Sequence, residues 1–238
     1  MKTDPVETSI YLCSPVNALV EGIYEEKVRL SEVLKHGDFG LGTFDGLDGE
    51  MLILDGRIYH IFSDGKVAEV GDHELTPFAA VTFYRPVSHD DLDRELSHDR
   101  FMKWLDRLLP SPNLFYAVRV EGEFSHVKAR SVPKQANYHP FADVANQQTI
   151  FDFNDISGTL AGFYTPAFMS SVSVPGMHLH FLSDDRRHGG HVLTCAPRKI
   201  RAGIQFIRKL ELSLPMTADY LNLHFRPSTD RDLDRVEK

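Results

Sequence analysis

Three histidines lie close enough along the chain to bind one metal ion. In the stretch PGMHLHFLSDDRRHGGHVL, residues 175–193, His178 and His180 are two positions apart on an expected strand. Their side chains therefore leave the same face, with Cα atoms roughly 6.6 Å apart. A polar turn with two glycines follows, and a returning antiparallel strand would bring His191 opposite the pair. The spacing predicts a site of three imidazoles.

Zinc is the metal that three imidazole nitrogens favour, with bonds of about 2.0–2.1 Å, and iron, nickel or cobalt are also accepted. A structural zinc is closed by a fourth protein ligand, whereas a catalytic zinc keeps one position for water or substrate. Cys195 lies four extended residues beyond His191, roughly 13 Å away, so it is not expected to be that ligand. His188 stands in the turn beside two arginines and is expected to be solvated. Spacing alone also leaves open a hairpin whose histidines bind no metal.

A carboxylate and a guanidinium are further candidates for chemistry. Glu50 shares one face of an expected strand with Leu52 and Leu54, which should point inward. A carboxylate on an apolar face is costly unless it is paired, so Glu50 lies either at the wet end of the strand or in a functional pocket. Arg130 comes late in another strand, before Pro133 ends it, and could clamp a carboxylate with two parallel hydrogen bonds. A surface salt bridge is the alternative for this arginine.

The composition is that of a globular protein with an acidic balance. The chain has 238 residues, 42% of them hydrophobic, which is enough for one large domain or two small ones. The formal net charge is −8 and the basic residues are scattered, so no nucleic-acid partner is expected. The two cysteines form no Cys-x-x-Cys pair, which favours a reducing compartment. With no signal-peptide pattern and no long apolar run, we expect a cytoplasmic protein without a membrane span.

Several common catalytic motifs are missing from the sequence. It contains no His-Glu-x-x-His pair, no Gly-x-Ser-x-Gly elbow, no Walker loop and no Rossmann fingerprint. The corresponding metalloprotease, serine hydrolase, nucleotide-hydrolysing and dinucleotide-binding classes therefore have no support. The histidine cluster remains the strongest signal of chemistry.

The pattern of elements predicts a protein rich in sheet. Short helices are expected to begin at Pro15, with Ser14 as N-cap, and after the cap Ser31, and one long helix is expected over residues 88–109. Asp55-Gly56 and Asp64-Gly65 predict a meander with tight turns between residues 37 and 70, and the second half is mostly strand. The polar stretch of residues 133–148 is the expected passage between two sheets.

Four stretches together resemble the alpha-acetolactate decarboxylase family, whose members make acetoin. They are GTFDGLDGEM (residues 42–51), ARSVPKQANYHPF (129–141), SGTLAGFYTP (157–166) and residues 175–193. The match is collinear from about Gly42 to the C-terminus, and its motifs are long. It is therefore far more specific than the histidine spacing alone.

The resemblance implies a fold and an assembly. The fold is α/β of the α+β type, with two packed sheet domains and few helices. Residues 1–147 would form a mixed-sheet domain that carries Glu50 and Arg130, and residues 148–238 an antiparallel-sheet domain that carries the three histidines. It also implies a Zn²⁺ cofactor, with other divalent transition metals as alternatives, and a homodimer.

The resemblance also assigns roles to single residues. His178, His180 and His191 match the family's zinc ligands, and Glu50 and Arg130 match its catalytic glutamate and arginine. Thr43 matches a residue near the pocket and, with Arg130, is assigned to substrate binding. Glu237 in the divergent C-terminal segment aligns with a second catalytic glutamate.

The implied reaction turns acetolactate into acetoin and carbon dioxide. The substrate's hydroxyl and ketone oxygens can chelate a metal, which stabilises the enediolate left by decarboxylation as a Lewis acid. On this hypothesis Arg130 orients the carboxylate or an enediolate oxygen, and Glu50 and Glu237 handle protons. Two carboxylates close together would raise the pKa of one of them, which suits an acid.

Two other classes of function stay open. The sequence PGMHLHF is similar to the opening of a cupin metal motif, which suggests a metal-dependent dioxygenase or isomerase. Asp184 and Asp185 stand where that motif normally has a glutamate. The other class is a non-catalytic binding module in which the histidines form a structural metal clip.

Overall fold

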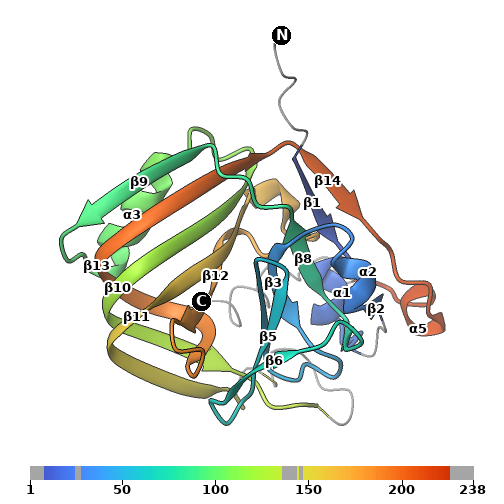
Figure 1. The fold of residues 1–238 in the computed structure, drawn as a ribbon. Helices are drawn as coiled ribbons and strands as arrows, with labels where there is room; N and C mark the ends of the chain where they lie inside the picture. The colour runs from blue at the N-terminus through green and yellow to red at the C-terminus, as the bar shows by residue number, and fades with distance from the viewer. Residues whose placement is uncertain (1–7, 25–27, 136–143, 145–146, 226–238) are drawn as a thin grey trace.

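Two β-sheets pack face to face and make up most of the protein (Figure 1). This computed structural model describes residues 8–24, 28–135, 144 and 147–225. One sheet is mixed and the other is antiparallel, and the helices are few and short. The expected α+β fold with one mixed and one antiparallel sheet is therefore confirmed.

Within the described residues, the mixed sheet has seven strands, which come mainly from the first third of the chain. In spatial order they are β14 (Lys209–Leu212), β1 (Ser9–Leu12), β8 (Ala79–Thr82), β3 (Phe39–Thr43), β4 (Glu50–Leu54), β5 (Arg57–Ile61) and β6 (Val67–Val70). Only the pair of β1 and β14 is parallel among these neighbours. A separate two-stranded ladder joins β2 (Val28–Arg29) to β7 (Leu75–Thr76).

The antiparallel sheet has five strands in the part of the chain that the structure describes, and three of them are long. In spatial order they are β10 (Phe115–Ser131), β11 (Thr149–Thr165), β12 (Gly176–Ser183), β13 (Gly189–Ile207) and β9 (Ser88–Asp93). Strand β13 also pairs with β10 along most of its length. Strands β10 to β13 thus form a closed ring of pairings, which brings β10 and β12 to the two sides of the start of β13.

A tight turn predicted from the sequence shapes the meander of the mixed sheet. Asp55 and Gly56 join β4 to β5 with φ values of 52° and 77°. Two left-handed residues in a two-residue loop match the twist of the flanking strands, which explains the Asp-Gly pair. The expected hairpin is confirmed at this position.

Apolar side chains fill the space between the sheets and the space behind the antiparallel sheet. Leu52 and Leu54 of β4 belong to the first cluster, together with Ala161 and Phe163 of β11. A second cluster lies between the antiparallel sheet and helix α3 (His98–Leu108) and includes Phe101. A third covers the outer face of the mixed sheet. The inward direction expected for Leu52 and Leu54 is confirmed.

The helices are shorter than the sequence pattern predicts. Residues 88–93 form strand β9 instead of the start of a long helix, because Leu92 alternates with exposed neighbours and pairs with Ile200. An ion pair of 2.7 Å between Asp91 and Arg201 also joins the two strands. The described residues also form α1 (Val16–Val20), α2 (Leu30–Val33), the 3₁₀ turn η1 (Ala167–Met169) and α5 (Ala218–Leu221).

The sheets do not follow the expected division of the chain at residue 147. Strands β9 and β10 lie in the antiparallel sheet, so Arg130 shares a sheet with the histidines. Residues 133–148 connect β10 to β11, which are neighbours in one sheet, so the prediction of a passage between two sheets is wrong. Conversely, β14 follows β13 and joins the mixed sheet beside β1. Local patterns give no signal of such long-range pairing.

The turn between β12 and β13 differs from the expected glycine turn. The chain reverses over residues 184–187, where Arg186 is left-handed with a φ of 59°. Gly189 and Gly190 belong to the start of β13 and pair with Leu182 and Phe181. A Cβ atom on Gly190 would lie 2.6 Å from the Arg130 carbonyl oxygen, so glycine permits the close approach of β10 here.

Within the described residues, no helix has the length and apolar character needed to cross a membrane.

Both cysteines are buried, and this gives a direct test of the packing. Cys13 and Cys195 are each 1% exposed, and burial raises the pKa of the Cys195 thiol to about 12. Because the thiolate is the reactive form, we expect neither thiol to be alkylated by iodoacetamide at pH 8 in the native protein. Both should react once guanidinium unfolds the chain. Mass spectrometry measures the labelling, and rapid alkylation of native Cys195 would contradict the structure.

Candidate metal centre and active site

Strand register alone brings three polar side chains to one face of the antiparallel sheet. His180 on β12 lies directly opposite His191 on β13. His191 in turn lies opposite Arg130 on β10. Residues directly opposite in an antiparallel pair project to the same side, so these three side chains point into the same space. The expectation that His191 returns opposite the histidine pair agrees with this register.

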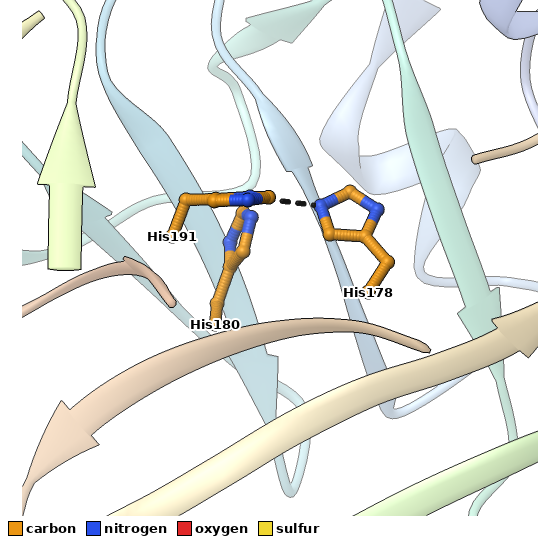
Figure 2. A group of neighbouring side chains, drawn as sticks. All are labelled: His178, His180 and His191. Atoms are coloured by element: carbon orange, nitrogen blue, oxygen red, sulfur yellow. Dashed lines mark hydrogen bonds between the residues drawn. The ribbon is translucent and has the colours of Figure 1, made fainter. Parts of the chain in front are cut away.

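The three histidine rings converge (Figure 2). One ring nitrogen from each of His178, His180 and His191 lies within 4.8 Å of the other two. His178 Nε2 and His191 Nδ1 are 3.2 Å apart. Two nitrogens on one tetrahedral metal with bonds of about 2.1 Å are separated by about 3.4 Å, so this pair already has the spacing of two ligands.

His180 is oriented by a backbone group of the other sheet. Its Nδ1–H donates to the carbonyl oxygen of Met51 on β4 at 2.9 Å. Its Nε2 is buried and has no hydrogen-bond partner among the described residues. A ring nitrogen fixed by a carbonyl while the other faces a pocket is the arrangement that metal-binding histidines adopt.

Burial keeps two of the histidines neutral. Desolvation, reinforced by the positive charge of Arg130, lowers the pKa of His178 to about 3. Burial also lowers the pKa of His180 well below its ordinary value, with smaller contributions from His178 and Arg130. The Met51 carbonyl opposes this shift. Neutral imidazoles have lone pairs to offer, so the donor set fits a divalent transition metal such as zinc.

Glu50 and Arg130 form a buried ion pair next to the histidines. Arg130 Nη1 lies 3.2 Å from Glu50 Oε1, and their side chains are 3% and 8% exposed. Glu50 Oε2 lies 3.4 Å from His180 Nε2. Both residues line one cavity with the three histidines. Glu50 therefore lies in a pocket and not at the wet end of its strand. Arg130 pairs with a buried carboxylate and does not form a surface salt bridge.

The turn of residues 44–49, between β3 and β4, places Glu50 at the cavity. Gly49 has a φ of 73°, and a Cβ there would lie 2.3 Å from the Ile61 carbonyl oxygen. The Thr43 hydroxyl donates to the Gly49 carbonyl at 2.7 Å, and Thr43 also lines the cavity. Thr43 thus holds the turn before Glu50, a contact that strand periodicity does not reveal.

An apolar wall completes the cavity, and sequence reasoning did not select its members. They come from α1, the β3–β4 turn, the residues beside β8 and β10, the connection from β10 to β11 and the loop before β12: Val16, Leu19, Leu47, Phe78, Val132, Val144 and Val174. These residues are far apart in the chain and have no shared spacing. Only the packing of the two sheets and α1 brings them together.

Three other sequence candidates lie elsewhere. His188 is exposed on the turn after β12, as expected. Cys195 packs in the cluster behind the antiparallel sheet, away from the cavity. Glu237 lies outside the described residues, so its role stays a prediction.

Comparison with known proteins agrees with the geometry. Residues 10–227 match the family model described as alpha-acetolactate decarboxylase. The chain belongs to the alpha-acetolactate decarboxylase family. The resemblance expected from four stretches, and the carboxy-lyase class that it names, are thereby confirmed.

Individual family members match over nearly the whole chain. The alpha-acetolactate decarboxylase of Methanosarcina mazei is 43% identical over 230 residues, which cover 96% of this chain and 80% of that protein. The Bacillus licheniformis family member is 40% identical over 217 residues, covering 91% and 86%. The crystal structure of the Bacillus subtilis strain 168 enzyme superposes with a TM-score of 0.93 at 37% identity, covering 96% of this chain and 99% of that one.

The histidine cluster predicts metal binding that can be measured without substrate. We expect His191→Ala to lower the bound metal from about one ion per chain to less than about 0.1, because two imidazoles hold a divalent ion weakly. Removing the metal with a chelator should also lower the Tm, since an ion that binds only the folded state stabilises it. Inductively coupled plasma mass spectrometry and thermal unfolding measure both effects.

His188→Ala is the matched control, because this exposed histidine lies on the same hairpin outside the cluster. It should retain full metal content. Equal metal content in the His188 and His191 variants would contradict the assignment of the ligands.

Proposed function

We propose that the protein converts 2-acetolactate into acetoin and carbon dioxide with a divalent metal, zinc being favoured, held by His178, His180 and His191. The observation that carries the proposal is the buried cavity that combines three converging histidines with the Glu50–Arg130 pair. Membership of the alpha-acetolactate decarboxylase family supports the substrate. A metal bound there supplies a Lewis acid for the substrate's hydroxyl and ketone oxygens and for the negative charge that develops on them.

Arg130 is the group that we assign to the substrate carboxylate. Its guanidinium is buried at the cavity, where a planar fork of N–H donors matches two carboxylate oxygens. Holding the carboxylate fixes the carbon–carbon bond that must break. When this bond breaks, carbon dioxide leaves and its electron pair remains on the four-carbon fragment as an enediolate.

Glu50 is the group that we assign to proton transfer. Acetoin forms when one proton adds to the enediolate carbon, so the reaction consumes one proton for each carbon dioxide released. The Glu50 carboxylate lies within 3.4 Å of His180 Nε2 and therefore reaches the place where the substrate oxygens would bind. Glu237 stays a second candidate for this proton on the strength of the sequence match alone.

The apolar wall excludes water from the reacting atoms. Leu19, Phe78 and Val174 lie on the wall and provide no hydrogen-bonding side chain. With little water to screen them, the charges of Arg130 and Glu50 act strongly on the substrate. Protonation of the enediolate by a positioned group, and not by solvent, is what a chiral product requires.

The two alternative functions fit the cavity less well. On the cupin hypothesis, a carboxylate after the second histidine would join the metal, but Asp184 and Asp185 are both exposed on the turn. A structural metal clip would need only the histidines, so that hypothesis does not account for the buried ion pair of Glu50 and Arg130 beside them. A cytoplasmic location and a homodimer stay predictions from the sequence.

Acetoin formation tests the proposed reaction directly. Purified metal-replete protein should release acetoin from racemic acetolactate, and a chelator should abolish the release. Glu50→Gln keeps the size and removes the charge, and we expect it to lower kcat by about 10²- to 10⁴-fold, the usual contribution of a general acid or base. Colorimetric acetoin assay and chiral chromatography measure rate and product configuration.

Glu69→Gln, the same substitution at an exposed position of the same sheet, is the matched control and should leave kcat unchanged. No acetoin from the metal-replete protein would overturn the proposed function. Full activity of Glu50→Gln would remove Glu50 from proton transfer and leave Glu237 to be tested.

The apolar wall should set the size of the substrate's alkyl group. We expect Leu19→Ala to raise kcat/KM for the analogue that carries ethyl in place of methyl, relative to acetolactate, by about 10-fold, near the lower limit for one methylene in a pocket. Competition between the two substrates gives the ratio. Leu34→Ala, at a position outside the cavity wall, should leave the ratio unchanged, and an unaltered ratio in Leu19→Ala would exclude Leu19 as a determinant.

A further inference from the structure

His60 is a buried polar side chain that lies outside the cavity. It is 6% exposed on β5 and pairs with Met51, whose side chain packs on the outer face of the mixed sheet. Its ring is stacked between Phe44 and Phe62, with centroid distances of 3.9 Å and 3.7 Å. Burial of an imidazole between two apolar rings is costly unless its nitrogens form hydrogen bonds.

The His60 ring contacts the turn that precedes Glu50. His60 Nε2–H donates to the Asp48 carbonyl oxygen at 2.5 Å. Asp48 is two residues before Glu50, and its carboxylate lies 4.0 Å from the same nitrogen. Burial lowers the pKa of His60, partly offset by Asp48, so the ring donates as neutral imidazole near neutral pH.

The backbone before Glu50 is held from three sides. His60 binds the Asp48 carbonyl from β5, and the Thr43 hydroxyl binds the Gly49 carbonyl from β3. The Gly49 N–H donates at 3.1 Å to the carbonyl oxygen of Val132, two residues after Arg130. Because Gly49 is left-handed and has no side chain, these bonds decide the direction in which Glu50 leaves the turn.

We propose that His60 is a positioning residue for the reaction, which through the Asp48 carbonyl fixes the turn that aims Glu50 at Arg130 and the histidines. This inference rests on the proposed function. His60 does not line the cavity, so it acts on the substrate only through Glu50.

Two substitutions separate the hydrogen bond from the packing. His60→Phe keeps an aromatic ring between Phe44 and Phe62 but removes the N–H, and we expect it to lower kcat by about 10- to 100-fold, the effect of a misplacement of about 1 Å. His60→Gln offers an amide N–H near the position of Nε2 and should recover kcat to within about 5-fold of the wild type. KM and bound metal should stay close to wild-type values in both.

A packing control and a double mutant complete the test. Phe62→Leu weakens the ring stack without touching the hydrogen bond, so it should lower the Tm but leave kcat unchanged. If His60 acts through Glu50, adding His60→Phe to Glu50→Gln should produce no further loss of kcat, because residues that act as a unit are not additive. A merely structural role would make the two losses multiply.

Failure of the His60 proposal can be told apart from failure of the proposed function. If the wild-type protein makes no acetoin, the proposed function fails. If it makes acetoin and folded His60→Phe has wild-type kcat, the role of His60 is overturned. Nitrogen-15 NMR of the histidine rings gives a reading independent of activity: we expect the Nε2–H tautomer for His60, and the Nδ1–H tautomer would overturn the inference.

Discussion

The site depends on one buried ion pair that joins the two sheets. Glu50 belongs to the mixed sheet and Arg130 to the antiparallel sheet, and their side chains are 8% and 3% exposed. Removing one partner of such a pair leaves an uncompensated buried charge, at a cost of about 3–5 kcal/mol, so each sheet requires the other in register. A buried pair is a poor source of net stability, because desolvation offsets the attraction. The presence of this ion pair between two apolar faces is therefore better explained by a role of its charges in the proposed reaction than by a contribution to stability.

Long strands and their pairing supply the precision that the ion pair needs. Arg130, His191 and His180 occupy directly opposite positions on three neighbouring strands, so their relative placement is set by backbone hydrogen bonds and not by flexible loops. The mixed sheet then contributes two contacts from adjacent residues, the Glu50 carboxylate and the Met51 carbonyl. Sites built on rigid elements hold their geometry better than sites on loops, which suits a reaction that requires an aligned bond.

Sequence patterns predicted the parts of this arrangement that are local. The His178–His180 spacing gives a shared face because the strand period is two, and Asp55–Gly56 gives a hairpin because a two-residue loop needs two left-handed residues. Arg130 was assigned to the wrong sheet, since nothing in residues 115–131 says that β10 pairs with β13, more than 60 residues later. Likewise Leu92 fits a helical period, and only its pairing with Ile200 makes it part of a strand. The hydrogen bond from Thr43 to the Gly49 carbonyl and the position of Leu19 on the cavity wall depend on tertiary structure. No periodic pattern in the sequence indicates either of them.

The charges at the cavity explain why neutral side chains suit the role of metal ligands here. Among the described residues that line it, Glu50 and Arg130 are the charged side chains, and they cancel. His178 and His180 add no charge at neutral pH, because burial keeps their pKa values low. An anionic substrate would thus find no net attraction in a chain whose formal charge is −8. A divalent ion held by imidazoles would raise the charge of the cavity by two, whereas carboxylate ligands would cancel that charge. The choice of histidine over aspartate or glutamate as ligand is therefore the choice that lets one small site attract an anion and stabilise further negative charge.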